Sequence, residues 1–206
     1  MLAALPSWAG FITVGNYDLN RGAYVDFQRN GSRDNAFAGV IQGFYDFGPL
    51  IDLLSADLYR HIGVGTFYSN RTPVTAADGF ARIAWLYDYE LTTATTPVLG
   101  AGLQLAIWDI MADGGDGLHQ GYLQVALGTP AAVADAWDYY LTISVGQSST
   151  LANFYINHNI EGVYLETLVG PGLTPPPPPP PPVPEPSTIT LVIVSVALLG
   201  ALKLRK

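Results

Sequence analysis

Apolar residues recur at helical spacing in three stretches near the middle of the chain. Residues 75–78 form a weak capping box before the apolar positions of 80–87. The stretch 100–111 has one apolar face and ends at the glycine-rich turn 113–117. The dipeptide 129–130 predicts an N-cap threonine followed by proline in the first turn of a third helix. The inward positions expected in these helices are Phe80, Ile83, Ala84 and Tyr87; Leu103, Ala106, Ile107 and Ile110; and Val133, Ala134, Trp137, Tyr140 and Leu141.

Runs of β-branched and aromatic residues between glycines predict strands on both sides of these helices. No repeat of fixed length interrupts this order. Strands, then helices, then further strands is an α+β arrangement, so we expect a β-rich α+β domain with about three helices in its middle. The expected strands are Phe11–Val14, Ala36–Tyr45, Ile51–Tyr59, Leu151–Ile156 and Gly162–Leu168.

The composition changes towards the C-terminus. Eleven of the sixteen prolines lie within Pro171–Pro186, and the unbroken run 175–182 predicts an extended polyproline linker. The apolar run 189–202 is followed by three basic residues in the last four positions. As a helix, 187–204 extends about 27 Å, close to the thickness of a bilayer core. We therefore predict a single C-terminal transmembrane helix whose basic end stays in the cytoplasm while the domain faces outward.

The first nine residues are mostly apolar and end in a small-x-small pattern. We interpret 1–9 as a truncated signal-peptide remnant that lacks the usual charged start, with a first strand as the alternative. The expected organisation is therefore this remnant, a surface domain over 10–170, a Pro-rich linker with its motif over 171–186, and a transmembrane helix with a basic tail over 187–206.

The part of the chain expected to fold is acidic. Residues 10–172 hold six arginines and sixteen acidic residues, a formal charge of −10. Binding of nucleic acid through counter-ion release needs clustered basic residues, so we expect no nucleic-acid partner. An apolar fraction of 49% with 13% charged residues excludes disorder over the whole chain. The absence of cysteine excludes disulfides, thiolate metal sites and cysteine nucleophiles.

No motif of a catalytic site is present in the sequence. His61, His119 and His158 lack metal-ligand spacing, and the chain has no nucleophile elbow, P-loop or dinucleotide fingerprint. Ser55 and Asp57 lie near His61, but groups this close on one strand do not form a catalytic triad. We expect no catalytic residue, no cofactor and no enzymatic activity.

Three aspartates surround the turn after the second expected helix. Asp109, Asp113 and Asp116 could gather carboxylates for calcium, which prefers six to eight oxygen ligands. Their spacing is not that of an EF-hand loop, and a helix end followed by a glycine turn explains the same residues. Asp113 and Asp116 are therefore only weak metal candidates, and the expected number of metal sites is none.

Residues 183–206 closely resemble the PEP-CTERM sorting signal, which combines a short motif, one hydrophobic helix and a basic end. The resemblance implies that an exosortase cuts near the motif and passes the protein to the outer surface or extracellular matrix of a Gram-negative bacterium. The helix is then a transient inner-membrane anchor, with the domain in the periplasm. The motif residues are Val183, Pro184, Glu185, Pro186 and Ser187.

The segment 101–110 resembles the Gln-x-Ala-Ile-Trp signature of bacterial surface thioester domains of the TQXA type. Residues 54–59, followed by 63–68, resemble the upstream stretch of that family, which normally reads Cys-Val-Asp-Leu. Together with the turn 113–117, these motifs are similar to thioester-like ectodomains found ahead of PEP-CTERM signals. The resemblance covers about residues 10–168.

The resemblance implies that Gln104 occupies the position of the reactive glutamine and that Ser55 replaces the cysteine. A thiol with a pKa of about 8.5 supplies thiolate near neutral pH, whereas a serine hydroxyl supplies almost no alkoxide without a base. We therefore expect the fold without its covalent bond, and Gln104 as a helix residue that bonds to neighbouring backbone.

The expected function is that of an exported, non-enzymatic structural or adhesive protein of the cell surface or biofilm matrix. The expected partners are exosortase, the membrane through the C-terminal helix, and surface components such as exopolysaccharide. Two alternatives stay open: a covalent adhesin with a Ser55–Gln104 ester, and a carbohydrate- or calcium-binding module. Aromatic residues such as Trp85 and Trp137 could stack on sugars, but the sequence favours ordinary core and interface packing because it shows no regular aromatic stripe.

Overall fold

The computed structural model describes residues 9–60, 63–75, 80–158 and 163–172. The chain divides into two units, 1–172 and 173–206, and every described residue belongs to the first. The polyproline linker, the motif Val183–Ser187 and the expected membrane span therefore lie outside the described residues, as does most of the expected signal remnant. Among the described residues, no helix is both long and apolar enough to span a bilayer.

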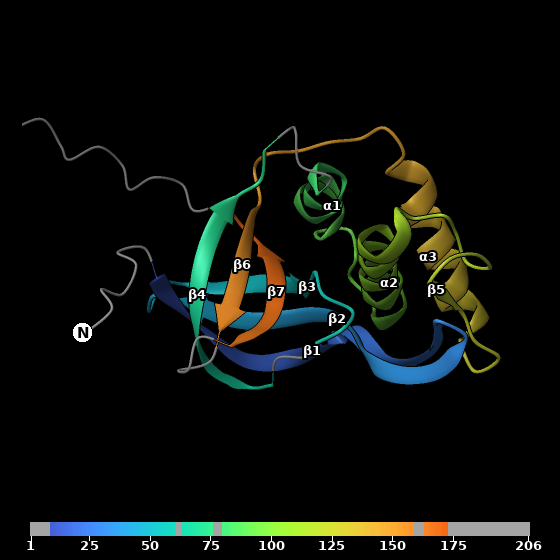
Figure 1. Ribbon diagram of the computed structural model, residues 1–206, viewed down its shortest axis with the longest axis horizontal. Helices are drawn as coiled ribbons and strands as arrows, with labels where there is room; N and C mark the ends of the chain where they lie inside the picture. The colour runs from blue at the N-terminus through green and yellow to red at the C-terminus, as the bar shows by residue number, and fades with distance from the viewer. Residues whose placement is uncertain (1–8, 61–62, 76–79, 159–162, 173–206) are drawn as a thin grey trace, which may run out of the picture. The chain divides into compact units, whose positions relative to one another are not determined.

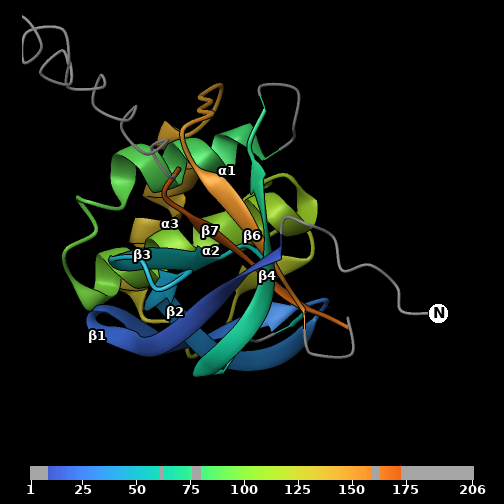
Figure 2. The same cartoon turned by 90° about the vertical axis from the view of Figure 1, so that its left-hand side faces the viewer.

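In the described part of the chain, six strands form a sheet that closes on itself (Figures 1 and 2). The antiparallel order is β1-β2-β3-β7-β6-β4, and β4 pairs again with β1. Ile12 lies at the closure, because it pairs with Tyr45 on one side and with Phe67 on the other. The seventh strand, β5, pairs with the far end of β1. The strands are β1 (Ala9–Arg29), β2 (Ser32–Tyr45), β3 (Leu50–Ser55), β4 (Gly65–Pro73), β5 (Leu123–Val125), β6 (Asn153–His158) and β7 (Tyr164–Gly170).

Alternate side chains of these strands fill the interior of the closed sheet. This follows from the two-residue period of a strand, which directs every second side chain to the same face. The resulting small core is aliphatic apart from one tyrosine. Its buried members are Ile12, Val14, Ile41, Ile51, Leu53, Tyr155 and Leu168.

The strands β1 and β2 continue beyond the closed sheet as a long two-stranded arm below α2 (Figure 1). The sequence predicts a first strand over Phe11–Val14 only, because polar residues and glycine follow. The register shifts between Tyr17 and Gly22, which is how the strand passes this polar stretch. Gly22 pairs with Gly39, and a Cβ on either residue would overlap the other strand. The two glycines therefore let the arm backbones approach closely.

Three α-helices lie in the middle of the described chain, as the apolar spacing predicts. They are α1 (Ala81–Trp85), which continues as the π-helical turn η1 (Leu86–Glu90), α2 (Pro97–Asp113) and α3 (Ala131–Ile143). Thr96 caps α2 by accepting a hydrogen bond from the Leu99 N–H at 3.2 Å. Gly114 ends α2 in the left-handed region, with φ 84°. The prediction of a β-rich fold with about three helices is confirmed.

The start of α3 differs from the prediction. The N-cap residue is Pro130, and Thr129 does not cap the helix. Instead, the Thr129 hydroxyl donates to the main-chain oxygen of Asp26 at 2.5 Å and accepts from the Ala126 N–H at 2.9 Å. The threonine therefore fastens the loop before α3 to the arm. Residues 76–78 of the expected capping box lie outside the described residues.

Several strand boundaries also differ from the prediction. The strand expected over Ile51–Tyr59 ends at Ser55, where the chain leaves the sheet. The strands β4 and β5 are not predicted by the strand pattern. In β4 the run Ser69–Arg71 is polar, so the sequence lacks the apolar alternation on which strand prediction depends. β5 has only three residues.

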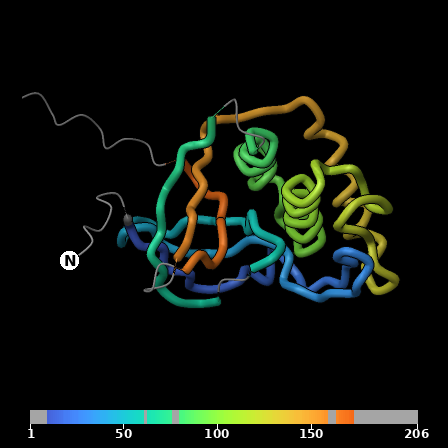
Figure 3. The backbone as a smooth tube through the Cα atoms, viewed as in Figure 1, coloured from blue at the N-terminus to red at the C-terminus, as the bar shows by residue number. Residues whose placement is uncertain are grey.

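The main core surrounds α2, which lies between the sheet and α3 (Figures 1 and 3). Every residue from Gly100 to Ile110 is buried, so α2 is packed on all sides. Close contacts need glycine here: a Cβ on Gly100 would overlap the Arg21 carbonyl, and one on Gly102 would overlap α3 at Ala136. The largest fully buried side chains of this core include Phe27, Trp108, Trp137 and Tyr140.

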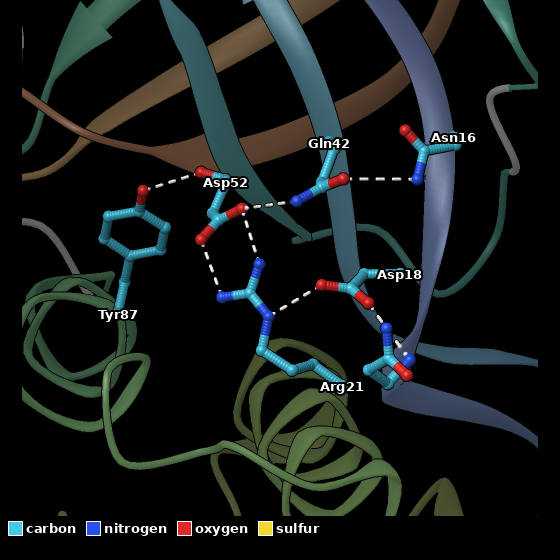
Figure 4. A network of polar contacts seen from close by, with 7 residues as sticks. Asn16, Asp18, Arg21, Gln42, Asp52 and Tyr87 are labelled. Atoms are coloured by element: carbon cyan, nitrogen blue, oxygen red, sulfur yellow. Dashed lines mark hydrogen bonds and ion pairs between the residues drawn. The ribbon is translucent and has the colours of Figure 1, made fainter.

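A polar network joins β1, β2 and β3 beside the helices (Figure 4). The Arg21 guanidinium donates to both carboxylate oxygens of Asp52 at 2.7 and 2.8 Å, and its Nε donates to Asp18 at 2.8 Å. The Tyr87 hydroxyl of η1 donates to the main-chain oxygen of Asp52 at 2.7 Å. The network thus connects the irregular stretch of β1, where its register shifts, to β3 and to η1.

Candidate functional site

The side chain of Gln104 lies against the backbone of Ser55. The Ser55 N–H donates to Gln104 Oε1 at 2.9 Å, and Gln104 Nε2 donates to the Ser55 carbonyl at 2.6 Å. Gln104 is 1% exposed and Ser55 is 4% exposed, so both hydrogen bonds are shielded from water. The structure therefore brings together the two residues that the thioester resemblance singles out, one from the end of β3 and one from the middle of α2.

The end of the β2–β3 pairing explains why a glutamine is needed here. The pairing stops at Leu53, opposite Ile41, and the other edge of β3 is already occupied by β7. Residues two apart in a strand direct their backbone groups to the same edge, so Ser55 has the same orientation as Leu53. With no strand opposite it, Ser55 uses the Gln104 carboxamide as its partner. The glutamine thus satisfies backbone groups that would otherwise be buried without hydrogen bonds.

The Ser55 hydroxyl contacts a buried carboxylate and an indole. Its Oγ is hydrogen-bonded to Glu166 Oε1 from β7, and Trp108 Nε1 from α2 donates to it at 3.2 Å. The Asp57 N–H donates to the same oxygen at 3.3 Å. Ser55, Trp108 and Glu166 are at most 4% exposed. Two distant segments of the chain and the neighbouring residue Asp57 therefore fix the position of one hydroxyl group.

This geometry favours hydrogen bonding over nucleophilic chemistry. The Ser55 hydroxyl has a single proton, and a carboxylate is a weak base for a group as weakly acidic as an alcohol. No histidine lies among the described residues that contact the Ser55 hydroxyl. Asp57 contacts that hydroxyl through its main chain, and His61 lies outside the described residues. The site provides an acceptor and donors at fixed positions and no base of the serine-hydrolase type.

Asp57 is itself held by the strand that carries Glu166. The Tyr164 hydroxyl donates to Asp57 Oδ2 at 2.6 Å, and the Tyr59 N–H donates to Asp57 Oδ1 at 2.8 Å. Burial, followed by the hydrogen bond with Asp57, raises the pKa of Tyr164 to about 12. Tyr164 therefore keeps its proton at physiological pH and remains a donor. This contact fixes the loop after β3 and, with it, the backbone of residue 57.

A pocket of about 220 Å³ lies above the Ser55 hydroxyl. Its floor includes Ser55, Trp108 and Glu166, and aromatic rings of the arm form its wall. The rings of Tyr17 and Phe37 are 4.8 Å apart, and those of Tyr24 and Phe37 are 5.7 Å apart. Burial and the charge of Glu166 raise the pKa of Tyr17, so its hydroxyl stays protonated near neutral pH. The full lining is Tyr17, Tyr24, Asn35, Ala36, Phe37, Ile41, Ser55, Trp108 and Glu166.

The three aspartates at the end of α2 form a second polar cluster. Asp109, Asp113 and Asp116 each place a carboxylate oxygen within 4.8 Å of the others. Asp109 is fully buried and accepts a hydrogen bond from Trp137 Nε1 at 3.0 Å, while Asp116 is exposed. Burial, followed by the nearby Asp113, raises the pKa of Asp109 to about 8. The carboxyl groups are therefore close enough to affect one another's ionisation.

The sequence indicates only part of the Ser55 site. The two motifs point to Ser55 and Gln104, and Trp108 follows from its place in the second motif. Glu166 is not indicated, because it lies 111 residues from Ser55 in a strand with no motif. The aromatic wall is likewise formed by pairing of β1 with β2, which no local pattern shows. Trp137 is fully buried, so it offers no surface for stacking on a sugar.

Comparison with protein-family models, with curated proteins and with solved structures gives no match to this chain.

Proposed function

We propose that the chain is an exported, non-enzymatic surface protein whose domain binds a carbohydrate of the cell surface or matrix at the Ser55 pocket. The observation that carries this proposal is the combination of an aromatic wall with a buried carboxylate and hydroxyl at its base. Sugars present apolar faces that stack on rings and hydroxyl groups that bond to carboxylates and amides. The exposed ring of Tyr24 and the side chains of Asn35 and Glu166 provide these features within one pocket.

The position of Gln104 supports non-covalent binding. Both polar groups of its carboxamide are used to pair the backbone of Ser55. The Ser55 hydroxyl bonds to Glu166 and Trp108. In thioester domains a cysteine thiolate attacks the glutamine carbonyl, and a serine hydroxyl is a much weaker nucleophile. The proposed role is therefore an adhesive domain that keeps the arrangement of a thioester-like site without its chemistry.

A covalent adhesin with a Ser55–Gln104 ester is a second candidate, and one contact favours it. Glu166 touches the Ser55 hydroxyl and could accept its proton while the oxygen attacks the Gln104 side-chain carbonyl and ammonia leaves. The low basicity of a carboxylate makes this step slow, so we rank it below non-covalent binding.

The C-terminal sequence supports export to the surface. The motif at 183–187, the apolar run and the basic end resemble, in this order, the parts of a PEP-CTERM signal. We propose that exosortase releases the domain after a transient stay in the inner membrane of a Gram-negative bacterium. An acidic domain on a proline linker then reaches the outer surface or the exopolysaccharide matrix.

Titration of the full chain with the exopolysaccharide of its native host tests the binding role. We expect saturable binding that weakens about tenfold in Tyr24→Ala, the loss expected for one aromatic contact. We expect Glu166→Gln to weaken binding as well, because it removes the charge and half of the acceptor capacity of this group. Tyr139→Ala is the matched control, since Tyr139 is 52% exposed but lies on α3 away from the pocket. Equal loss in Tyr24→Ala and Tyr139→Ala, or no binding at all, contradicts the proposal.

A further inference from the structure

The aspartate cluster at the end of α2 contains two buried oxygen atoms without hydrogen-bond partners. Asp109 Oδ1 and Asp113 Oδ1 both have this property among the described residues. Asp109 is 0% exposed, and its other oxygen is already used by Trp137. Buried polar atoms are normally paired, because an unpaired one loses its hydration without compensation. These two oxygens therefore indicate a missing partner inside the cluster.

The other contacts of the cluster hold its carboxylates in place but supply no donor to these two oxygens. Asp113 Oδ2 accepts from the backbone N–H groups of Tyr122 and Leu123, which fixes the orientation of its carboxylate. A Cβ on Gly121 would overlap the carboxylates of Asp113 and Asp116, so the backbone of Gly121 closes one side. The three carboxylates each place an oxygen within 4.8 Å of the others, and Asp116 is exposed to solvent.

We infer that Asp109, Asp113 and Asp116 bind a hard divalent cation of the calcium type. Carboxylate oxygens are the ligands that calcium prefers, and its flexible coordination is compatible with an irregular turn. The end of a helix favours a cation as well, because its carbonyl groups carry partial negative charge. A cation here pairs both orphan oxygens and compensates the charge of the ionised carboxylates. This inference is independent of the carbohydrate pocket.

The nearest arginine does not replace this cation. Arg82 donates to the main-chain oxygens of Gly114 and Leu141 and to the Ser144 hydroxyl. Within the described residues, no ion pair joins a cationic side chain to any of the three aspartates. A proton shared between Asp109 and Asp113 is the competing explanation for the two orphan oxygens. The two explanations differ in one respect: added metal should bind to a cation site, whereas a shared proton predicts no response to metal.

Terbium luminescence of the full chain tests the site directly. Trp137 lies 3.0 Å from Asp109 Oδ2 through its Nε1, so a Tb³⁺ ion in the cluster is close to a sensitising indole. We expect Tb³⁺ emission on tryptophan excitation, and displacement of that emission by CaCl₂. We also expect about 10 mM CaCl₂, above the range of weak extracellular sites, to raise the thermal midpoint by about 4 °C.

Variants of the exposed ligand keep the test independent of folding. Asp116→Asn changes an exposed residue. We expect it to weaken Tb³⁺ and Ca²⁺ binding about tenfold, because one charged ligand is lost. Asp138→Asn on α3 removes the same charge from an exposed position outside the cluster and should leave binding unchanged. Absence of both emission and thermal shift overturns the inference, as does equal weakening by the two variants. A thermal shift with MgCl₂ and none with CaCl₂ overturns the assignment to calcium.

Discussion

Gln104 and Ser55 are joined by two hydrogen bonds that replace a missing strand pairing. The amide of Gln104 accepts from the Ser55 N–H and donates to the Ser55 carbonyl, at 2.9 and 2.6 Å. The pairing of β2 with β3 ends two residues earlier. A side chain from α2 therefore takes over where the sheet stops, and it fixes the distance between the helix and the floor of the pocket.

Removal of this amide should destabilise the domain. Gln104→Ala leaves the buried N–H and carbonyl of Ser55 unpaired, and each unpaired group costs about 1–3 kcal/mol. We expect a loss of about 2–4 kcal/mol in the free energy of unfolding, measured by urea denaturation. Gln147→Ala, at an exposed glutamine after α3, is the control and should change stability by less than about 0.5 kcal/mol. Similar stability of the two variants contradicts a structural role for the Gln104 carboxamide.

A cysteine at residue 55 should form a thioester with Gln104 once the neighbouring charge is removed. In Ser55→Cys alone, the Glu166 carboxylate beside residue 55 disfavours the thiolate. We expect Ser55→Cys combined with Glu166→Gln to lose the mass of one ammonia and to incorporate methylamine at Gln104. Ser69→Cys is the control, because Ser69 is also buried but has no hydrogen bond to a glutamine among the described contacts. An unchanged mass of the double variant means that residue 55 cannot reach the Gln104 carbonyl.

The Arg21 network should stabilise the fold in a pH-dependent way. Burial alone would raise the pKa of Asp18, but hydrogen bonds from Arg21 and Asn20 outweigh it and lower that pKa. A carboxyl whose pKa is lowered by folding contributes stability above its unfolded pKa, and this contribution disappears as the pH falls through the folded value. We expect Arg21→Met to cost about 1–2 kcal/mol at pH 7, since the pair is partly exposed.

The control for this prediction is Arg33→Met, because the Arg33 side chain is 67% exposed in its ion pair with Asp26. It should cost less than Arg21→Met does, because solvent screens an exposed ion pair. The difference in the free energy of unfolding between wild type and Arg21→Met should shrink as the pH falls below about 4, because Asp18 then becomes protonated. A difference that stays constant or grows on acidification would show that the Asp18 charge does not contribute.

The sequence predicts the layout of this fold better than its site. Helices such as α2 follow from local spacing and end signals, and the pairing of Ser55 with Gln104 was indicated by two motifs. Strand β1 extends far beyond Val14 because pairing with β2 and packing of Gly100 on Arg21 stabilise a polar stretch of low strand propensity. Glu166 and the wall around Tyr24 depend on contacts between distant strands, so no local pattern contains them.

The membrane orientation proposed for residues 187–206 gives a prediction that is independent of the domain. Basic residues at the end of a span stay on the cytoplasmic side. A reporter fused after Lys206 should therefore be cytoplasmic in cells that lack exosortase. A periplasmic reporter would contradict the interpretation of residues 187–206 as an outward-anchored span.

The intact mass of the protein recovered from its native host tests the central claim most directly. We expect a chain that ends within Pro184–Ser187 and carries an unmodified Gln104. A chain end within this range would support exosortase processing. An unmodified Gln104 would support a domain without an internal ester. A chain that extends to Lys206 and lacks the mass of one ammonia would contradict both parts.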